Sequence, residues 1–178
     1  MPAPAFAGGA DLVKAARTQV GVTVIYDGSY RSLKYPGGDL PLERGVCTDV
    51  VVRALRSARS IDLQKNLHED MRAHWDAYSH PLGWHLAQPD ANIDHRRVPN
   101  LMTWFARAGH AVSSSGVAGD YLPGDIVSWD LGGRVLHIGI VSDRRSATGV
   151  PLVLHNIGAG AREEDILFRY SIIGHYRL

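Results

Sequence analysis

The chain has 178 residues, of which 19 are Lys or Arg and 18 are Asp or Glu, leaving a formal net charge of +1. This length suits one domain that buries roughly 70% of the surface of its unfolded chain. The balance of charge argues against nucleic acid as a partner. No apolar run approaches the roughly 20 residues that a membrane-spanning helix needs, so we expect no membrane span.

The first nine residues resemble the end of a leader sequence. Residues 5–7, Ala-Phe-Ala, have the small-x-small pattern of a signal-peptide cleavage site. We therefore expect residues 1–9 to be a leader remnant or a flexible tail of an exported protein. Residues 10–178 are expected to form one domain.

Two helices and a short strand are predicted in the N-terminal third. Apolar residues at helical spacing predict a first helix over residues 10–20. The β-branched and aromatic stretch VTVIYDGSY, residues 22–30, then predicts a short strand or extended segment. A second helix is predicted from Thr48 onward.

The second predicted helix carries a row of arginines. Its apolar positions follow a helical period, and three arginines spaced by three residues lie on another face. They are Arg53, Arg56 and Arg59. We interpret this row as a solvated face.

The middle of the chain, residues 61–115, is rich in His, Trp and helix-forming residues. Breaks are expected at SHPLGW, residues 79–84, and again before Asn100. Asn100 is the predicted N-cap of a further helix, LMTWFARAG, which Gly109 ends. These helices are expected to pack on or beside the core.

Beyond Gly119 the pattern changes to strands separated by turns. Four segments are rich in β-branched or aromatic residues and bounded by Gly, Pro, Asp or Ser. They are residues 122–130, 134–143, 150–158 and 165–178. Helices followed by strands predict an α+β fold, with N-terminal helices packed on an antiparallel sheet of at least four strands.

Cys47 is the one cysteine of the chain, so it forms no internal disulfide and no cysteine-rich zinc site. It is either an inert buried thiol or a nucleophile. Its predicted position at a helix start favours a thiolate, because unpaired N–H groups and a partial positive charge lie there. Its own backbone N–H would also lie near the oxyanion of an acyl-transfer intermediate.

A candidate base lies in the strand VLHIGIVSD. Side chains alternate along a strand, so His137 points away from the face of Leu136 and Ile138. A hairpin centred near Ser146 would place His155 directly opposite His137. A slip of one residue would place Asn156 there instead, and both registers stay open.

The order of these segments resembles the NlpC-like branch of the papain-fold peptidases. It resembles more closely a bacterial family, domain of unknown function 1287, whose members carry stretches similar to GVCTDVV, PNLMT, PGDIV and HNIGAG. The resemblance covers nearly the whole chain. It implies a papain-like fold over residues 10–178, with residues 61–115 as a longer helical and loop insertion.

The resemblance also implies a function: a cysteine amidase or endopeptidase that acts on the stem peptides of peptidoglycan. We expect the protein to be periplasmic or secreted, to act as a monomer and to need no cofactor. Cys47 matches the nucleophile, His137 the general base and His155 the residue that orients the imidazole. Tyr26 matches an aromatic position of the active site, where its hydroxyl could donate to the oxyanion.

Asp49 and Asn156 are further candidates for substrate or oxyanion contacts. Asp49 departs from the small residues that usually follow the cysteine in this superfamily, and it either contacts a cationic substrate group or favours the first helical turn. Two other functions remain open. One is a non-catalytic cell-wall binding module, and the other is a zinc hydrolase that uses Cys47, His137 and His155 as metal ligands.

Overall fold

The structure is a computed structural model and describes residues 9–78 and 87–178. The predicted tail, apart from Gly9, and the break at SHPLGW lie outside the described residues. The α-helices of the described part are α1 (Gly9–Arg17), α2 (Cys47–Arg59), α3 (Leu63–Ala73) and α4 (Val98–Arg107). Its strands are β1 (Ile25–Tyr26), β2 (Arg44–Gly45), β3 (Ile126–Asp130), β4 (Leu136–Arg145), β5 (Pro151–His155), β6 (Arg162–Glu164) and β7 (Ser171–Tyr176).

The main sheet is antiparallel and has the strand order β6-β5-β4-β3-β7. Strands β3 to β6 follow one another as a meander, and β7 returns to pair with the outer edge of β3. The predicted α+β class with an antiparallel sheet is thus confirmed. The short strand β6 was not predicted, and β1 and β2 pair in parallel as a separate ribbon.

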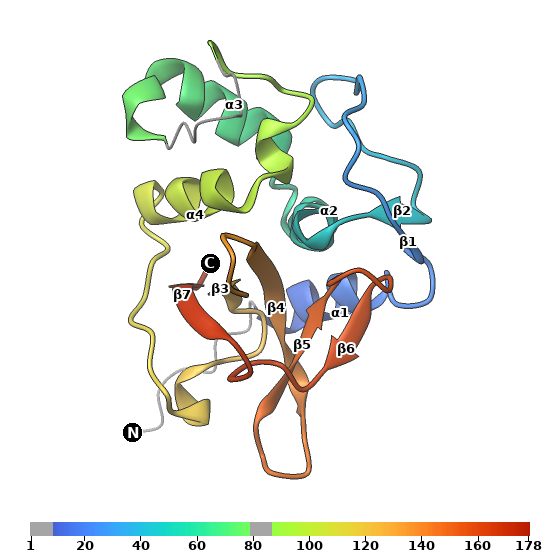
Figure 1. The fold of residues 1–178 in the computed structure, drawn as a ribbon, viewed down its shortest axis with the longest axis vertical. Helices are drawn as coiled ribbons and strands as arrows, with labels where there is room; N and C mark the ends of the chain where they lie inside the picture. Colours follow the sequence, from blue (N-terminus) through green and yellow to red (C-terminus); the bar gives the residue numbers. More distant parts are fainter. Residues whose placement is uncertain (1–8, 79–86) are drawn as a thin grey trace.

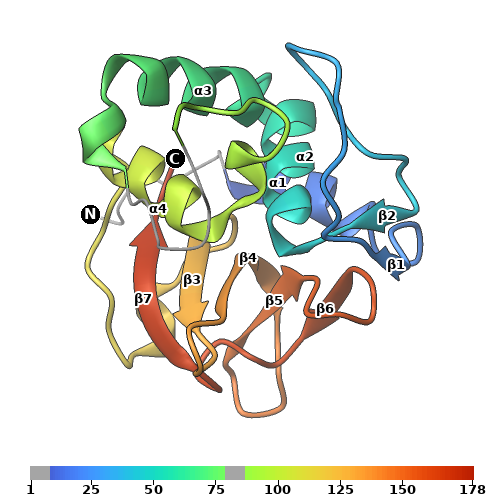
Figure 2. The same ribbon diagram turned by 45° about the horizontal axis from the view of Figure 1, so that its top comes forward.

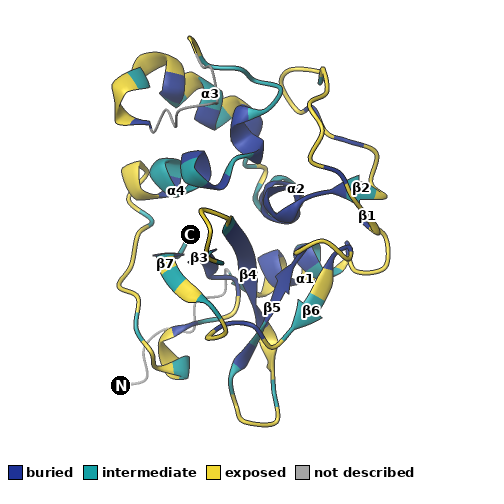
Figure 3. Ribbon diagram, viewed as in Figure 1, coloured by how far each residue is buried: buried dark blue, intermediate teal, exposed yellow. Residues whose placement is uncertain are grey.

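The helices cover one face of this sheet, as Figures 1 and 2 show for α1, α2 and α4. The apolar side of α2, including Val51, Ala54 and Leu55, is fully buried in the main core, and the helix packs against α1, β4 and β5. Figure 3 shows α2 and the central strands as the most continuously buried elements. A smaller apolar cluster around Trp129 fills the other face of the sheet.

The start of α4 differs from the predicted cap. Arg97 is the N-cap residue, Val98 begins the helix and Pro99 lies in its first turn, where a missing N–H costs little. Asn100 lies inside this turn, and its side-chain amide donates to the carbonyl oxygen of Asp94 over 3.0 Å. The predicted end is confirmed, because the helix stops just before Gly109, whose φ is +81°.

The interpretation of the arginine row on α2 as a solvated face was wrong. Arg53 is only 7% exposed, and each of the three arginines pairs with a carboxylate from another segment. The partners of Arg53, Arg56 and Arg59 are Asp39, Asp62 and Asp11, respectively. The chain between β1 and β2 supplies Asp39, so this face of α2 holds a loop in place instead of facing water.

Within the two described ranges, the helices are all too short or too polar to span a bilayer.

Candidate active site

Cys47 is the first residue of α2, as predicted. The preceding Val46 has an extended backbone, and its N–H donates to the Asp49 carboxylate over 2.7 Å, which satisfies a main-chain group at the helix start. The Cys47 side chain is nearly buried, with 6% exposed. The helix start thus holds the thiol at a defined place at the edge of the core.

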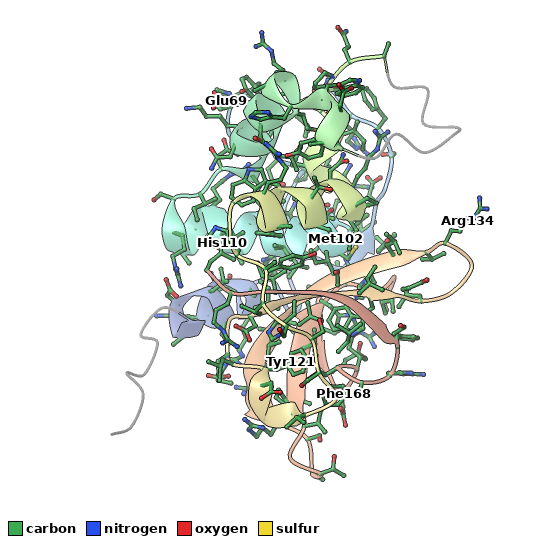
Figure 4. All side chains as sticks on the ribbon, turned by 90° about the vertical axis from the view of Figure 1, so that its left-hand side faces the viewer. Glu69, Met102, His110, Tyr121, Arg134 and Phe168 are labelled. Atoms are coloured by element: carbon green, nitrogen blue, oxygen red, sulfur yellow. The ribbon has the colours of Figure 1, made fainter. Side chains whose placement is uncertain are left out.

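Cys47 lines a cleft of about 910 Å³. One wall comes from the start of α4, with Pro99 and Met102, and the opposite wall from the chain around Asp130, Arg134 and Leu136. Figure 4 shows Met102 on the sheet side of α4 and Arg134 projecting from the β3–β4 loop. The thiol therefore borders a space large enough for a peptide segment.

Tyr26 lies in the same cleft, and it comes from strand β1. Its side chain is 47% exposed, and burial of the rest together with the nearby Cys47 and Asp49 raises the pKa of its hydroxyl. The hydroxyl therefore stays a proton donor at neutral pH. The expected position of Tyr26 beside the cysteine agrees with this arrangement, while its contact with an oxyanion stays a prediction.

The thiol itself is not activated in the way that its helix position predicts. Burial raises the pKa of Cys47 to about 11, although backbone N–H groups of Ile138, Thr48 and Cys47 itself oppose the shift. The charge of Asp49 raises the pKa further. Desolvation thus outweighs the helix terminus, and the resting form is the neutral thiol.

This pKa predicts a slow reaction of Cys47 with iodoacetamide at neutral pH. Because the thiolate is the reactive form, the alkylation rate should be below that of free cysteine at pH 8 and should keep rising toward pH 11. The measurement is the second-order rate constant against pH, with free cysteine as the reference. A rate that levels off below pH 8 would instead show a thiolate at rest.

The pairing of β4 with β5 differs from the predicted register. Ile140 pairs with Leu154, so His155 lies opposite Gly139 and two residues away from the expected partner His137. The register shifts along β4 between Val141 and Arg145, which the sequence pattern did not reveal. A shift of two residues preserves the face, and both histidines still point to the same side of the sheet.

Gly139 allows the two histidines to meet across this diagonal. A Cβ atom at residue 139 would lie 3.0 Å from Cβ of His155 and 2.8 Å from a methyl group of Val153. Without it, Nδ1 of His155 lies 2.9 Å from Nε2 of His137. The predicted contact between the two side chains is therefore present, although they are not directly opposite.

The hydrogen-bond chain continues to a carboxylate. Nε2 of His155 lies 2.9 Å from Oε2 of Glu164, on the neighbouring strand β6. Both rings are almost completely buried. Burial and the charge of His155 lower the pKa of His137 to about 3, and burial lowers the pKa of His155 while Glu164 opposes the shift. Both imidazoles are therefore neutral at pH 7.

Asn156 points elsewhere. Its amide nitrogen donates to the carbonyl oxygen of Gly45 over 3.2 Å, and its amide oxygen accepts from the N–H of Gly158. These bonds tie the end of β5 to the segment that leads into α2. Of the two residues that the sequence left open as the partner of His137, His155 makes the contact and Asn156 does not.

Cys47 approaches β4 from the helix side, where Ile138 packs, whereas His137 extends from the other face beside Trp129. The main-chain N–H of Ile138 donates a hydrogen bond to the sulfur of Cys47. It can do so because β5 ends opposite Gly139 and leaves this part of the β4 edge uncovered. In the described structure no hydrogen bond joins the thiol to His137. Such bonds are often long in free enzymes and shorten when substrate binds.

The carboxylate of Asp49 makes structural contacts within the fold. It is buried and forms an ion pair with Arg96, with 3.1 Å between Nη2 and Oδ2. Arg96 also donates to the carbonyl oxygens of Asp27 and Ser29. Of its two suggested roles, the structure favours helix stabilisation, and the same contacts attach the 27–29 segment beside Tyr26.

Two contributors to the site were missed in the sequence. Glu164 belongs to a strand of three residues with no strong alternation, and Arg96 lies in a short 3-10 helix (Asp94–Arg96) far from Cys47 in sequence. The one signal for Glu164 in the sequence was the alternation of side chains along residues 161–165, which places Glu163 and Glu164 on opposite faces of a strand. No comparable local signal marked Arg96.

The described residues contain no group of three or more His, Cys, Asp or Glu side chains placed to hold a metal ion. His137 and His155 direct their facing nitrogens at one another instead of at a common point. This arrangement gives the zinc hypothesis no support.

These features define an α+β protein with a cysteine at a helix start and, on an antiparallel sheet, a buried pair of histidines that is hydrogen-bonded to a partly exposed glutamate. The chain belongs to the family described as Domain of unknown function (DUF1287), whose model matches residues 13–178. It is 55% identical over 166 residues to the Escherichia coli (strain K12) protein named "Uncharacterized protein YijF", a match that covers 93% of this chain and 80% of that protein. No solved structure matches the chain.

Proposed function

We propose that this chain is a cysteine hydrolase with an NlpC-like papain fold that cleaves amide bonds in the stem peptides of peptidoglycan. The observation that carries the proposal is the placement of Cys47. It lines an open cleft at the start of α2 and contacts the main chain directly after His137, whose ring is held by His155. The candidate nucleophile thus lies against the strand that carries the candidate base, and a second histidine orients that base, which supports a cysteine hydrolase.

The reaction starts from a neutral pair. Nδ1 of His137 takes the proton from Sγ of Cys47 as the sulfur attacks the carbonyl carbon, and this proton then passes to the nitrogen of the leaving amine as the C–N bond breaks. Water attacks the resulting thioester, His137 accepts a proton from that water, and the thiol leaves with the proton restored. Lowered pKa values leave His137 unprotonated and available over the whole neutral range.

The oxyanion of each tetrahedral intermediate would lie near the first turn of α2. Backbone N–H groups at a helix start have no partner inside the helix and are therefore available to donate hydrogen bonds to an oxyanion. The Tyr26 hydroxyl borders the same cleft and is a second donor. This position of Tyr26 in the cleft supports the oxyanion role that the superfamily resemblance implies.

The cleft also fits a charged peptide. Arg134 lies at its rim, and no salt bridge to this side chain is found in the described ranges. Stem peptides carry free carboxylates, which an exposed guanidinium can bind. The proposal therefore includes a location in the periplasm or outside the cell, where peptidoglycan lies, and action as a monomer.

Arg134→Gln should raise KM by about fivefold and leave kcat unchanged, since an exposed charge pair contributes up to about 1 kcal/mol. The measurement is the steady-state rate on soluble muropeptides. Arg72→Gln is the matched control, because Arg72 is also exposed but lies on α3, away from the cleft lining. Equal KM values for both variants would remove Arg134 from the substrate site.

The proposal is tested by mass spectrometry of peptidoglycan incubated with the protein, in the presence and absence of a strong chelator. We expect new soluble fragments with one amide bond hydrolysed, in equal amounts under both conditions. Activity lost with chelator and restored by zinc would favour the zinc hydrolase. Cosedimentation with peptidoglycan without new amino groups would favour the binding module.

A further inference from the structure

We infer that Glu164 is a positioning residue that sets the protonation pattern of both active-site imidazoles and thereby leaves Nδ1 of His137 as the basic atom. The inference rests on the proposed function for its catalytic meaning. The hydrogen-bond pattern that it assigns can be measured without any activity.

Few side chains surround the pair formed by His137 and His155. His155 is 1% exposed and lies between His137 of β4 and Glu164 of β6. Arg162 on β6 is a further charged neighbour, since its guanidinium lies 3.9 Å from the second oxygen of Glu164 and its charge acts on His155. The uncharged ring of Trp129 packs beside His137 from β3. Cys47 of α2 contacts the main-chain N–H of Ile138, the residue after His137.

The protons of this chain can be assigned one bond at a time. A carboxylate accepts hydrogen bonds and donates none, so Nε2 of His155 must carry the proton that joins it to Glu164. A neutral imidazole holds one proton, so Nδ1 of His155 is an acceptor. The 2.9 Å contact then requires a proton on Nε2 of His137. Nδ1 of His137 is left with a free lone pair.

This pattern determines what His137 can do. With its proton on Nε2, the ring has at Nδ1 a nitrogen that can take a proton. With the opposite tautomer, it would present an N–H group and could not act as a base. When His137 becomes an imidazolium, the same hydrogen bonds connect the new charge to the Glu164 carboxylate. Glu164, which contacts His155 and not His137, therefore determines whether His137 can act as a base.

The adjacent Glu163 shows that an acidic residue in β6 does not by itself contact the histidines. Its side chain points to the other face of β6, where it binds Arg17 over 2.8 Å and accepts from Ser142. Glu163→Gln therefore removes the same charge from the same strand without touching the histidines. It is the matched control for every Glu164 variant.

The direct test is a long-range ¹H–¹⁵N correlation spectrum of the imidazoles at pH 7. His137→Gln and His155→Gln spectra assign the signals. In the wild type and in Glu163→Gln, we expect a proton on Nε2 and a bare Nδ1 in both rings. Glu164→Lys places a donor where the acceptor was, and it should move the proton to Nδ1 in both rings. Glu164→Gln, which can accept or donate, should give a mixture.

The kinetic test uses the same variants on muropeptides. Glu164→Gln should lower kcat about 100-fold with KM nearly unchanged, and Glu164→Lys should lower it further, whereas Glu163→Gln should match the wild type. Melting temperatures show whether each variant is folded.

The outcomes separate this inference from the proposed function. A wild-type spectrum with the proton on Nδ1 of His137, or variants at residue 164 that leave both tautomers unchanged, would overturn the inference. If the spectra follow the expected pattern but the wild type cleaves nothing, Glu164 still sets the tautomers and the hydrolase proposal fails.

Discussion

Replacing Cys47 by alanine is expected to lower kcat/KM for stem-peptide cleavage by about 10⁴-fold or more. The proposed mechanism passes through a thioester on this sulfur, and the chain holds no second cysteine to replace it. The remaining groups, His137 and the main-chain donors, can only assist direct attack by water, which leaves a small residual rate. The measurement is the rate of amine release from a soluble muropeptide.

The loss of activity in Cys47→Ala must be distinguished from unfolding of the variant. Removal of the nearly buried sulfur atom of Cys47 should cost about 1 kcal/mol, or a few degrees in melting temperature. His137→Ala should lose activity to a similar extent, because the thiol then has no base.

His175→Ala is the matched control for a buried histidine. His175 is as buried as His137 and is paired with Asp125 over 2.7 Å. It lies on β7, and its other ring nitrogen contacts the carbonyl oxygen of Ser113 instead of a second histidine. The substitution should lower stability while the folded protein keeps its specific activity. Cleavage retained by a folded Cys47→Ala variant would contradict the proposed mechanism.

Local patterns were sufficient to place the chemical groups on their elements. Cys47 could be placed at the start of α2 because an irregular segment rich in Pro and Gly changes there to a helical apolar period. His137 and His155 could be assigned to one face of the sheet because parity along a strand depends only on the strand being present. The face survives any register error of two residues, which is why the predicted contact is present despite the wrong register.

Features that depend on distant segments could not be predicted in this way. The register along β4 is set by an irregularity between Val141 and Arg145, and Glu164 reaches His155 through a strand of only three residues. The buried state of Arg53 depends on Asp39, which lies in a loop without periodicity. A periodic pattern shows which side of a helix is polar, but it does not show whether water or another segment covers that side.

The pKa of the Cys47 thiol also depends on distant segments and could not be predicted from local patterns. A helix start predicts a lowered pKa for Cys47, and the N–H groups that produce this effect are present. Burial of the sulfur, which only the packed structure reveals, has the larger effect and raises the pKa instead. The protein therefore keeps its nucleophile neutral until a base removes the proton, and this requirement makes the tautomer of His137 important.

Asp49→Ala is expected to lower the free energy of unfolding by about 3–5 kcal/mol, and the melting temperature by about 10 °C. The variant leaves the guanidinium of Arg96 buried without its counter-charge, since the side chain of Arg96 is 2% exposed. It also removes the acceptor for the N–H of Val46 at the start of α2. Chemical denaturation monitored by circular dichroism measures the loss.

Asp11→Ala is the matched control for an ion pair attached to the same helix. Asp11 pairs with Arg59 of α2, but its side chain is 42% exposed, and breaking an exposed pair should cost less than about 1 kcal/mol. The double variant Asp49→Ala/Arg96→Met should recover part of the stability, because the uncompensated charge is then gone. If Asp49→Ala were as stable as Asp11→Ala but had a raised KM, Asp49 would be a substrate contact and its ion pair with Arg96 would be incidental.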